Sequence, residues 1–126
     1  MKNHILLLLL LCLVGCKSAD RGATLLIGTY TDAGSRGIYR TTFTDGSFSA
    51  PELVVEVDNP SFLALSADGR YLYAVSEGGT DSTSALNAYR YDATTDGFSL
   101  INRQPTYGAS PCYVRLFDRY AYPANY

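Results

Sequence analysis

The chain of 126 residues is poor in histidine and cysteine. Its only histidine is His4, within the first fifteen residues, and these have the pattern of a leader that the mature protein loses. The mature chain therefore has no Ser-His-Asp or Cys-His device and no His-ligated zinc site among its own residues. Of the three cysteines, Cys12 leaves with the leader, so only Cys16 and Cys112 remain.

The mature chain also lacks an excess of basic residues. Removal of residues 1–15 takes Lys2 away, which leaves 9 basic residues against 12 acidic ones and a net charge of −3. This mild acidity argues against a nucleic-acid partner, which would require a basic face. The glycines at positions 28, 78 and 79 are followed by no helical pattern, so they do not form a phosphate-binding loop. The sequence predicts neither a metal nor a cofactor.

Residues 1–15 read as a secretory signal. Lys2 precedes an unbroken apolar run over residues 5–14, which is too short for a membrane-spanning helix of about 20 apolar residues. The motif LVGC at residues 13–16 resembles the lipobox of bacterial lipoproteins, which implies cleavage before Cys16 and lipid on its sulfur and amine. We therefore expect a protein of the bacterial cell envelope, anchored to a membrane through Cys16, with a linker over residues 16–23. Cys112 is then a single thiol without a disulfide partner.

The rest of the sequence repeats itself with a period near fifty residues. TLLIGTY, YLYAVSE and YAYPANY end at Tyr30, Glu77 and Tyr126, which are 47 and 49 residues apart. DNPSFLAL at residues 58–65 aligns with ASPCYVRL at residues 109–116, and their prolines are 51 residues apart. Periods of this length are typical of solenoids and propellers.

Each repeat consists of short runs rich in tyrosine, β-branched and aliphatic residues. Asp-Gly, Gly-Gly, Asn-Pro and Ser/Thr clusters separate these runs, which is the pattern of strands joined by tight turns. No window has apolar residues at helical spacing, so we expect almost no helix. Four strands in 40–50 residues match one blade of a β-propeller. The sequence thus predicts an all-β propeller over residues 24–126, with about two four-stranded blades; a β-sandwich is the alternative.

One hairpin of this predicted propeller brings polar residues together. FLALS (62–66) and YLYAVS (71–76) flank a turn in which Gly69 supplies the positive φ. An antiparallel hairpin places Asn59 and Glu77 at the same end, opposite the turn. By the repeat, Ser110, Asn125 and Tyr126 lie at that end of the next blade. Glu77 is therefore predicted to mark a rim where the strands meet water.

The sequence resembles the lactonase family of 6-phosphogluconolactonase-type, seven-bladed propellers. The resemblance rests on IGTYTDAGSRGIYRTTF (27–43), NPSFLALSADGRYLYAVSE (59–77) and GASPCYVRLFDRYAYPANY (108–126). It covers residues 24–126, which correspond to about the first third of a family member. It implies hydrolysis of a sugar δ-lactone without a metal cofactor. The histidine and arginine motifs to which that work is usually assigned lie in later blades of the family, so no catalytic residue is carried over to this chain.

Two departures from the family pattern fall near the end of the chain. The turn LFDRY (116–120) lacks the Asp-Gly of its counterpart and is two residues shorter. Pro123 stands where the sister strand has Ala74, and proline removes a donor from a β-ladder. We interpret the chain as a truncated N-terminal part of a longer protein or the product of a misread frame, with natural divergence as the alternative.

Several side chains are candidates for binding. Glu77 is a candidate for sugar hydroxyls, or a solvated strand end. Asn125 and Tyr126 offer an amide and a phenol at the same rim, or form a disordered terminus. A phosphate would suit the arginines, which otherwise solvate the surface: Arg36, Arg40 and Arg90. Ser61 reads as a turn residue. Cys112 alternates with its neighbours in an apolar strand and is expected to be a buried small hydrophobe rather than a reactive thiol.

The resemblance and the residues together predict hydrolysis of a sugar lactone by water activated in the central channel of the full-length protein. The chain alone is expected to be inactive. An exported lipoprotein is separated from the phosphorylated sugars of the cytoplasm. The predicted location therefore indicates that the substrate is a lactone other than 6-phosphogluconolactone, or that the protein has no catalytic activity. The alternative function is a non-enzymatic propeller that binds a glycan or protein partner on its rim.

Overall fold

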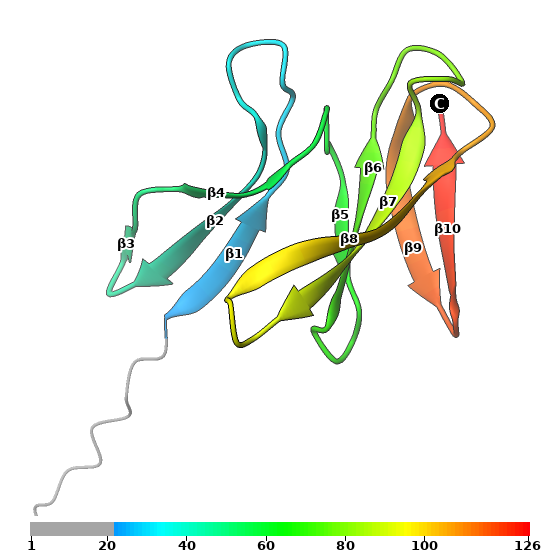
Figure 1. The fold of residues 1–126 in the computed structure, drawn as a ribbon. Helices are drawn as coiled ribbons and strands as arrows, with labels where there is room; N and C mark the ends of the chain where they lie inside the picture. The colour runs from blue at the N-terminus through cyan, green and yellow to red at the C-terminus, as the bar shows by residue number, and fades with distance from the viewer. Residues whose placement is uncertain (1–21) are drawn as a thin grey trace, which may run out of the picture.

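A computed structural model describes residues 22–126, and this part of the chain is all β, without a helix (Figure 1). The predicted signal and the predicted lipidation at Cys16 lie outside the described residues, as does most of the predicted linker. In the described part, no helix is long and apolar enough to cross a membrane. The ten strands are β1 (Ala23–Ile27), β2 (Gly37–Thr44), β3 (Ser47–Phe48), β4 (Glu52–Glu56), β5 (Leu63–Leu65), β6 (Tyr71–Ser76), β7 (Ala85–Asp92), β8 (Gly97–Pro105), β9 (Pro111–Phe117) and β10 (Tyr120–Asn125).

The strands form three antiparallel sheets that follow the sequence repeat. The first sheet holds β1 to β4, the second has the order β5-β6-β7-β8, and the third is the pair β9 and β10. Figure 1 shows the sheets side by side, with β1, β6 and β10 running in the same direction. We call the contact between the first and second sheets the first seam, and the contact between the second and third sheets the second seam.

The first sheet differs from a simple four-stranded blade. Both β3 and β4 pair with β2, one beyond the other, so that together they occupy the place that β8 takes beside β7. Residues 49–51, which include a proline, separate β3 from β4. The first sheet is therefore three strands wide, because β3 and β4 share one place beside β2, whereas the second sheet is four strands wide.

The predicted hairpin of the second sheet is confirmed. Leu63 pairs with Ala74 and Leu65 with Leu72 across β5 and β6. Gly69 has a φ of 69° in the connecting turn, the left-handed conformation that glycine adopts without a steric penalty. The neighbouring Asp68 accepts hydrogen bonds from Ser66 and Arg70, which lower its pKa to about 2. The turn is thus held by its own side chains.

The hydrophobic core lies at the first seam. Ile38 and Val55 of the first sheet pack with Leu72, Ala74 and Tyr89 of the second, and all five side chains are buried. A large apolar side chain that is fully buried contributes roughly 1.5–3 kcal/mol. The core accounts for one face of β6, and β5 and β6 also contact β9 of the third sheet, as expected for a blade packed between two neighbours.

The third sheet tolerates both departures from the repeat. Asp118 and Arg119 form a two-residue turn, with Phe117 paired to Tyr120 on either side of it and a φ of 53° at Asp118. Pro123 pairs with Val114 in β10, which has a single neighbour among the described strands. A proline is accepted on such an edge strand because one side of the strand needs no donor.

Candidate functional site

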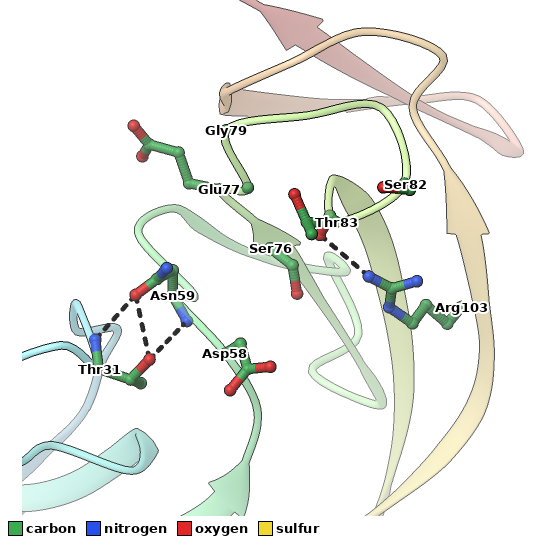
Figure 2. A pocket seen from close by; sticks show the side chains of 10 residues that line it. Thr31, Asp58, Asn59, Ser76, Glu77, Gly79, Ser82, Thr83 and Arg103 are labelled. Atoms are coloured by element: carbon green, nitrogen blue, oxygen red, sulfur yellow. Dashed lines mark hydrogen bonds between the residues drawn. The ribbon is translucent and has the colours of Figure 1, made fainter.

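The candidate site lies at the end of the sheets where β1, β6 and β10 finish. The loop after β1, the segment before β5 and the loop after β6 meet there (Figures 1 and 2). The backbone N–H of Glu77 donates to the carbonyl oxygen of Asn59 over 3.0 Å. The prediction that Asn59 and Glu77 share one end of the hairpin is therefore confirmed.

A hydrogen bond across the first seam joins two side chains at this end. The Tyr30 hydroxyl donates to Oε2 of Glu77 over 2.9 Å, between residues 47 positions apart in the sequence. The bond to the carboxylate raises the pKa of the Tyr30 phenol, and partial burial and the negative charge of Glu77 act in the same direction. Tyr30 nevertheless remains 57% exposed, so a ligand can reach the pair. Glu77 makes no other side-chain hydrogen bond within residues 22–126.

Sequence reasoning missed this pair, although the repeat contains its signal. Tyr30 and Glu77 occupy equivalent positions of consecutive repeats. Equivalent positions of neighbouring blades lie side by side around the axis of a propeller. Their side chains can therefore contact one another when each points towards the neighbouring blade, as those of Tyr30 and Glu77 do. A repeat alignment therefore predicts lateral contacts as well as strands.

Asn59 connects the two loops that carry the pair. Its Oδ1 accepts from the backbone N–H of Thr31 over 2.8 Å and from the Thr31 hydroxyl over 3.1 Å (Figure 2). Close approach of the loop is required here, because a Cβ at position 28 would overlap the carbonyl oxygen of Pro60. Gly28 thus lets the first sheet reach the segment before β5.

Beside Glu77 lies a hollow of about 440 Å³, which we call the rim hollow. Figure 2 shows Asp58, Ser76 and Arg103 around it, with the Glu77 side chain at its edge. Its lining combines two carboxylates, one guanidinium and several hydroxyls: Asp58, Glu77, Arg103, Thr31, Ser82 and Thr83. Such a mixture of donors and acceptors suits a ligand rich in hydroxyl groups.

Arg103 is a second residue that the sequence did not single out. It lies near the end of β8, and its Nη2 donates to the carbonyl oxygen of Thr83 over 3.1 Å (Figure 2). The strand INRQP carries no special motif, so only the topology, which brings the end of β8 to the rim, reveals the residue.

The structure does not bring the predicted residues Asn125 and Tyr126 into the rim hollow. Nδ2 of Asn125 donates to the carbonyl oxygen of Thr106 over 3.0 Å, and the side chain lies against Gly108. The Tyr126 side chain is fully exposed, and its backbone N–H donates to the carbonyl oxygen of Ser110. Ser110 in turn donates to the carbonyl oxygen of Gly78 over 2.7 Å, so this end of the third sheet does lie beside the second, as predicted.

Two of the candidate phosphate-binding arginines are engaged in ion pairs. Arg36 pairs with Glu56 over 3.0 Å on the surface. Arg40 pairs with Glu52 over 3.0 Å and with Asp96 of the second sheet over 2.7 Å, and its side chain is only 19% exposed. The carboxylates raise the pKa of both guanidinium groups. Arg90 is exposed on β7. None of these three arginines lines the rim hollow.

The prediction for Cys112 is wrong, because its side chain is exposed. Pro111 pairs with Asn125 and Tyr113 with Ala124, so Cys112 is the extra residue of an irregularity in β9. A bulge interrupts the alternation of faces on which the prediction depended.

Ser61, expected to be a turn residue, has a buried hydroxyl oxygen without a hydrogen-bond partner in the described structure. Residues 22–126 also contain no group of three or more metal-binding side chains.

The comparison with protein families decides between propeller and sandwich. Residues 24–126 match the family described as lactonase, 7-bladed β-propeller. The chain belongs to the lactonase family. The three sheets of Figure 1 are accordingly blades, or parts of blades, of a seven-bladed propeller.

Known members of the lactonase family are similar to the chain over a limited part of their own length. A 6-phosphogluconolactonase of Bacillus subtilis (strain 168) is 31% identical over 104 residues, which span 79% of this chain and 29% of the relative. A 6-phosphogluconolactonase of Formosa agariphila is 33% identical over 96 residues, which span 73% of this chain and 27% of that protein.

Solved structures give the same result. A periplasmic gluconolactonase of Pseudomonas aeruginosa superposes with a TM-score of 0.76 at 33% identity, over 84% of this chain and 31% of that protein. A candidate 6-phosphogluconolactonase of Bacteroides fragilis superposes with a TM-score of 0.77 at 39% identity, over 86% and 31% of the two chains. The chain thus spans less than a third of the length of these lactonase-family proteins.

Proposed function

We propose that the complete protein hydrolyses a sugar lactone and that residues 24–126 provide one part of the wall around its substrate. The observation that carries this proposal is the match of residues 24–126 to the lactonase family, together with two relatives that are named 6-phosphogluconolactonase. The site geometry supports it, because Glu77 and the hydroxyl-rich hollow beside it offer hydrogen bonds to a polyol.

Lactone hydrolysis requires little beyond water and well-placed polar groups. Water adds to the carbonyl carbon, the bond from this carbon to the ring oxygen breaks, and the ring oxygen takes a proton. The product is an open-chain hydroxy acid. The reaction therefore needs a group that activates water or protonates the leaving oxygen, and donors for the developing oxyanion.

We assign Tyr30 and Glu77 to binding rather than to proton transfer. The Tyr30 hydroxyl already donates to Glu77, and a phenol with a raised pKa is a poor base at neutral pH. The carboxylate can accept hydrogen bonds from sugar hydroxyls at its remaining acceptor positions. The groups that activate water are then the histidine and arginine residues of later blades, as the family resemblance implies.

The second part of the proposal concerns location. We propose that the protein is held in the bacterial cell envelope by lipid on Cys16, because a basic start, an apolar run and LVGC precede the fold. Several acyl chains on one residue give far more stable anchoring than a single chain. Cys16→Ser should release the protein into the aqueous phase of a detergent partition, and globomycin should block its maturation. An unchanged, soluble mature form would contradict the anchor.

The activity is tested in a protein that carries residues 24–126 within a complete seven-bladed propeller. Acid release from 6-phosphogluconolactone and from gluconolactone is followed in a pH-stat, with spontaneous hydrolysis subtracted and heat-unfolded protein as the control. Saturable turnover of either lactone supports the proposal, and their relative kcat/KM values identify the substrate class. Failure on both would favour the alternative, a propeller that binds a glycan or a protein partner on its rim.

A further inference from the structure

We propose that Asn59 is a positioning residue, which sets the distance and direction between the Tyr30 hydroxyl and the Glu77 carboxylate; this inference deepens the proposed function and rests on it. No other residue among 22–126 is bonded both to the neighbour of Tyr30 and to the backbone of Glu77. Its side chain bonds to the loop of Tyr30, and its main chain bonds to Glu77 and, more weakly, donates from its N–H to the Thr31 hydroxyl over 3.4 Å.

The side chain of Asn59 fixes the Tyr30 loop. Oδ1 accepts two hydrogen bonds from Thr31, over 2.8 Å from the backbone N–H and 3.1 Å from the hydroxyl. Thr31 follows Tyr30 directly, so a bond to its N–H also fixes the peptide plane that Tyr30 and Thr31 share. The direction in which the phenol leaves the backbone is therefore determined from across the first seam.

The main chain of Asn59 fixes Glu77. Its carbonyl oxygen accepts from the N–H of Glu77 over 3.0 Å and from the N–H of Ser61 over 2.8 Å. To present its carbonyl and its side chain in these directions, Asn59 adopts a φ of 43°. Asparagine is one of the few non-glycine residues that enter this left-handed region readily, which explains the residue type.

The equivalent position of the next repeat separates the two roles. Ser110 also has a positive φ, of 49°, and also precedes a proline. Its carbonyl oxygen accepts from the N–H of Tyr126 over 3.2 Å, as that of Asn59 accepts from Glu77. No side-chain bond of Ser110 to the second sheet accompanies this contact in the described structure. Both repeats thus contain the bond to the main-chain carbonyl oxygen, whereas only Asn59 of the two residues accepts hydrogen bonds with its side chain from the preceding blade.

Substitutions at both positions, in the complete propeller, test the inference. Asn59→Gly keeps the left-handed backbone and removes only the side-chain acceptor, and Ser110→Gly is the matched control. The first readout is the titration of Tyr30 by NMR with tyrosine labelled at Cζ, assigned with Tyr30→Phe. We expect the pKa of Tyr30 to fall towards its ordinary value in Asn59→Gly and to stay raised in Ser110→Gly. An unchanged titration in both variants would overturn the inference.

The second readout is a double-mutant cycle on KM for the lactone that is turned over. We expect Asn59→Gly and Tyr30→Phe each to raise KM by about tenfold with kcat retained, and the double variant to do no more than either alone, because both remove the same contact. Effects that multiply to about a hundredfold would show that Asn59 acts independently of Tyr30 and would overturn the inference. Since the NMR titration needs no turnover, it tests the role of Asn59 even where the proposed activity fails.

Discussion

The two seams join equivalent elements but are built from different kinds of contact. At the first seam, side chains bond across the sheets: Tyr30 to Glu77, Asn59 to Thr31 and Arg40 to Asp96. At the second seam, the hydrogen bonds end on backbone carbonyl oxygens, from the Ser110 N–H to Gly78 and from the Asn125 side chain to Thr106. A ring pair of Phe62 and Tyr113 lies 4.8 Å apart between centroids.

This difference separates what the propeller needs from what a particular site needs. Backbone bonds and apolar packing depend little on residue identity, so each repeat can reproduce them. Bonds between specific side chains require matched residues in two repeats at once. Their concentration at the first seam therefore indicates where function constrains the sequence, in addition to the fold.

The largest expected effect, on both stability and activity, comes from producing the three sheets and their two seams without the rest of the propeller. Residues 16–126 produced alone should aggregate and show no lactonase activity, because apolar side chains remain exposed on the first and third sheets, among them Leu25, Ile27, Phe117, Tyr120 and Tyr122. Light scattering, thermal melting and the pH-stat assay check this. A monomer that melts cooperatively and hydrolyses 6-phosphogluconolactone would contradict it.

The next effect concerns binding at the two seams. In the complete propeller, Glu77→Gln should raise KM for the lactone by about tenfold while kcat changes little, because a charge-assisted acceptor is lost in both the ground state and the transition state. Tyr126→Phe, at the equivalent position of the next repeat, is the control and should leave both constants unchanged. Steady-state kinetics decide. A kcat reduced a thousandfold at constant KM would make Glu77 catalytic, and no change would return it to a solvated strand end.

A smaller effect is expected from the ion pairs at the other end of the first seam. Arg40→Met should lower the free energy of unfolding of the complete propeller by about 1 kcal/mol, because Arg40 is largely covered and holds carboxylates on both sheets. Arg36→Met removes an exposed pair within the first sheet and should cost less. Denaturant unfolding at low and high salt measures both. Equal losses for the two variants would show that the bond between sheets has no special value.

The smallest effect concerns the turn of the second sheet in acid. Hydrogen bonds from Ser66 and Arg70 lower the folded-state pKa of Asp68 to about 2, below the 3.8 of an unperturbed aspartate. The carboxylate therefore stabilises the fold fully above about pH 4, and this contribution is lost as the pH falls towards 2. Asp68→Asn should melt earlier than the parent protein at pH 6 and converge with it near pH 2. A constant difference in melting temperature across this range would refute the assignment.

The sequence was sufficient for the repeat, the hairpins and the shared end of Asn59 and Glu77. These features follow from local rules: alternation of side chains, glycine in tight turns and antiparallel pairing. The positions of Arg103 and Cys112 did not follow, for two physical reasons. Arg103 reaches the rim only through the stacking order of the strands, and a bulge in β9 reverses the orientation that strict alternation gives to Cys112. Such a bulge leaves no mark in the residue types.

The sharing of Asn59 between two sheets has a consequence for recombination of these proteins. A propeller suggests exchange of whole blades, with crossover points in the loops between sheets. Here a crossover between residues 31 and 59 would leave the Thr31 loop of one parent facing the amide of the other, although every strand would still find its partner. The unit that can be inherited intact is therefore the stretch from Gly28 to Glu77, which begins in one blade and ends in the next.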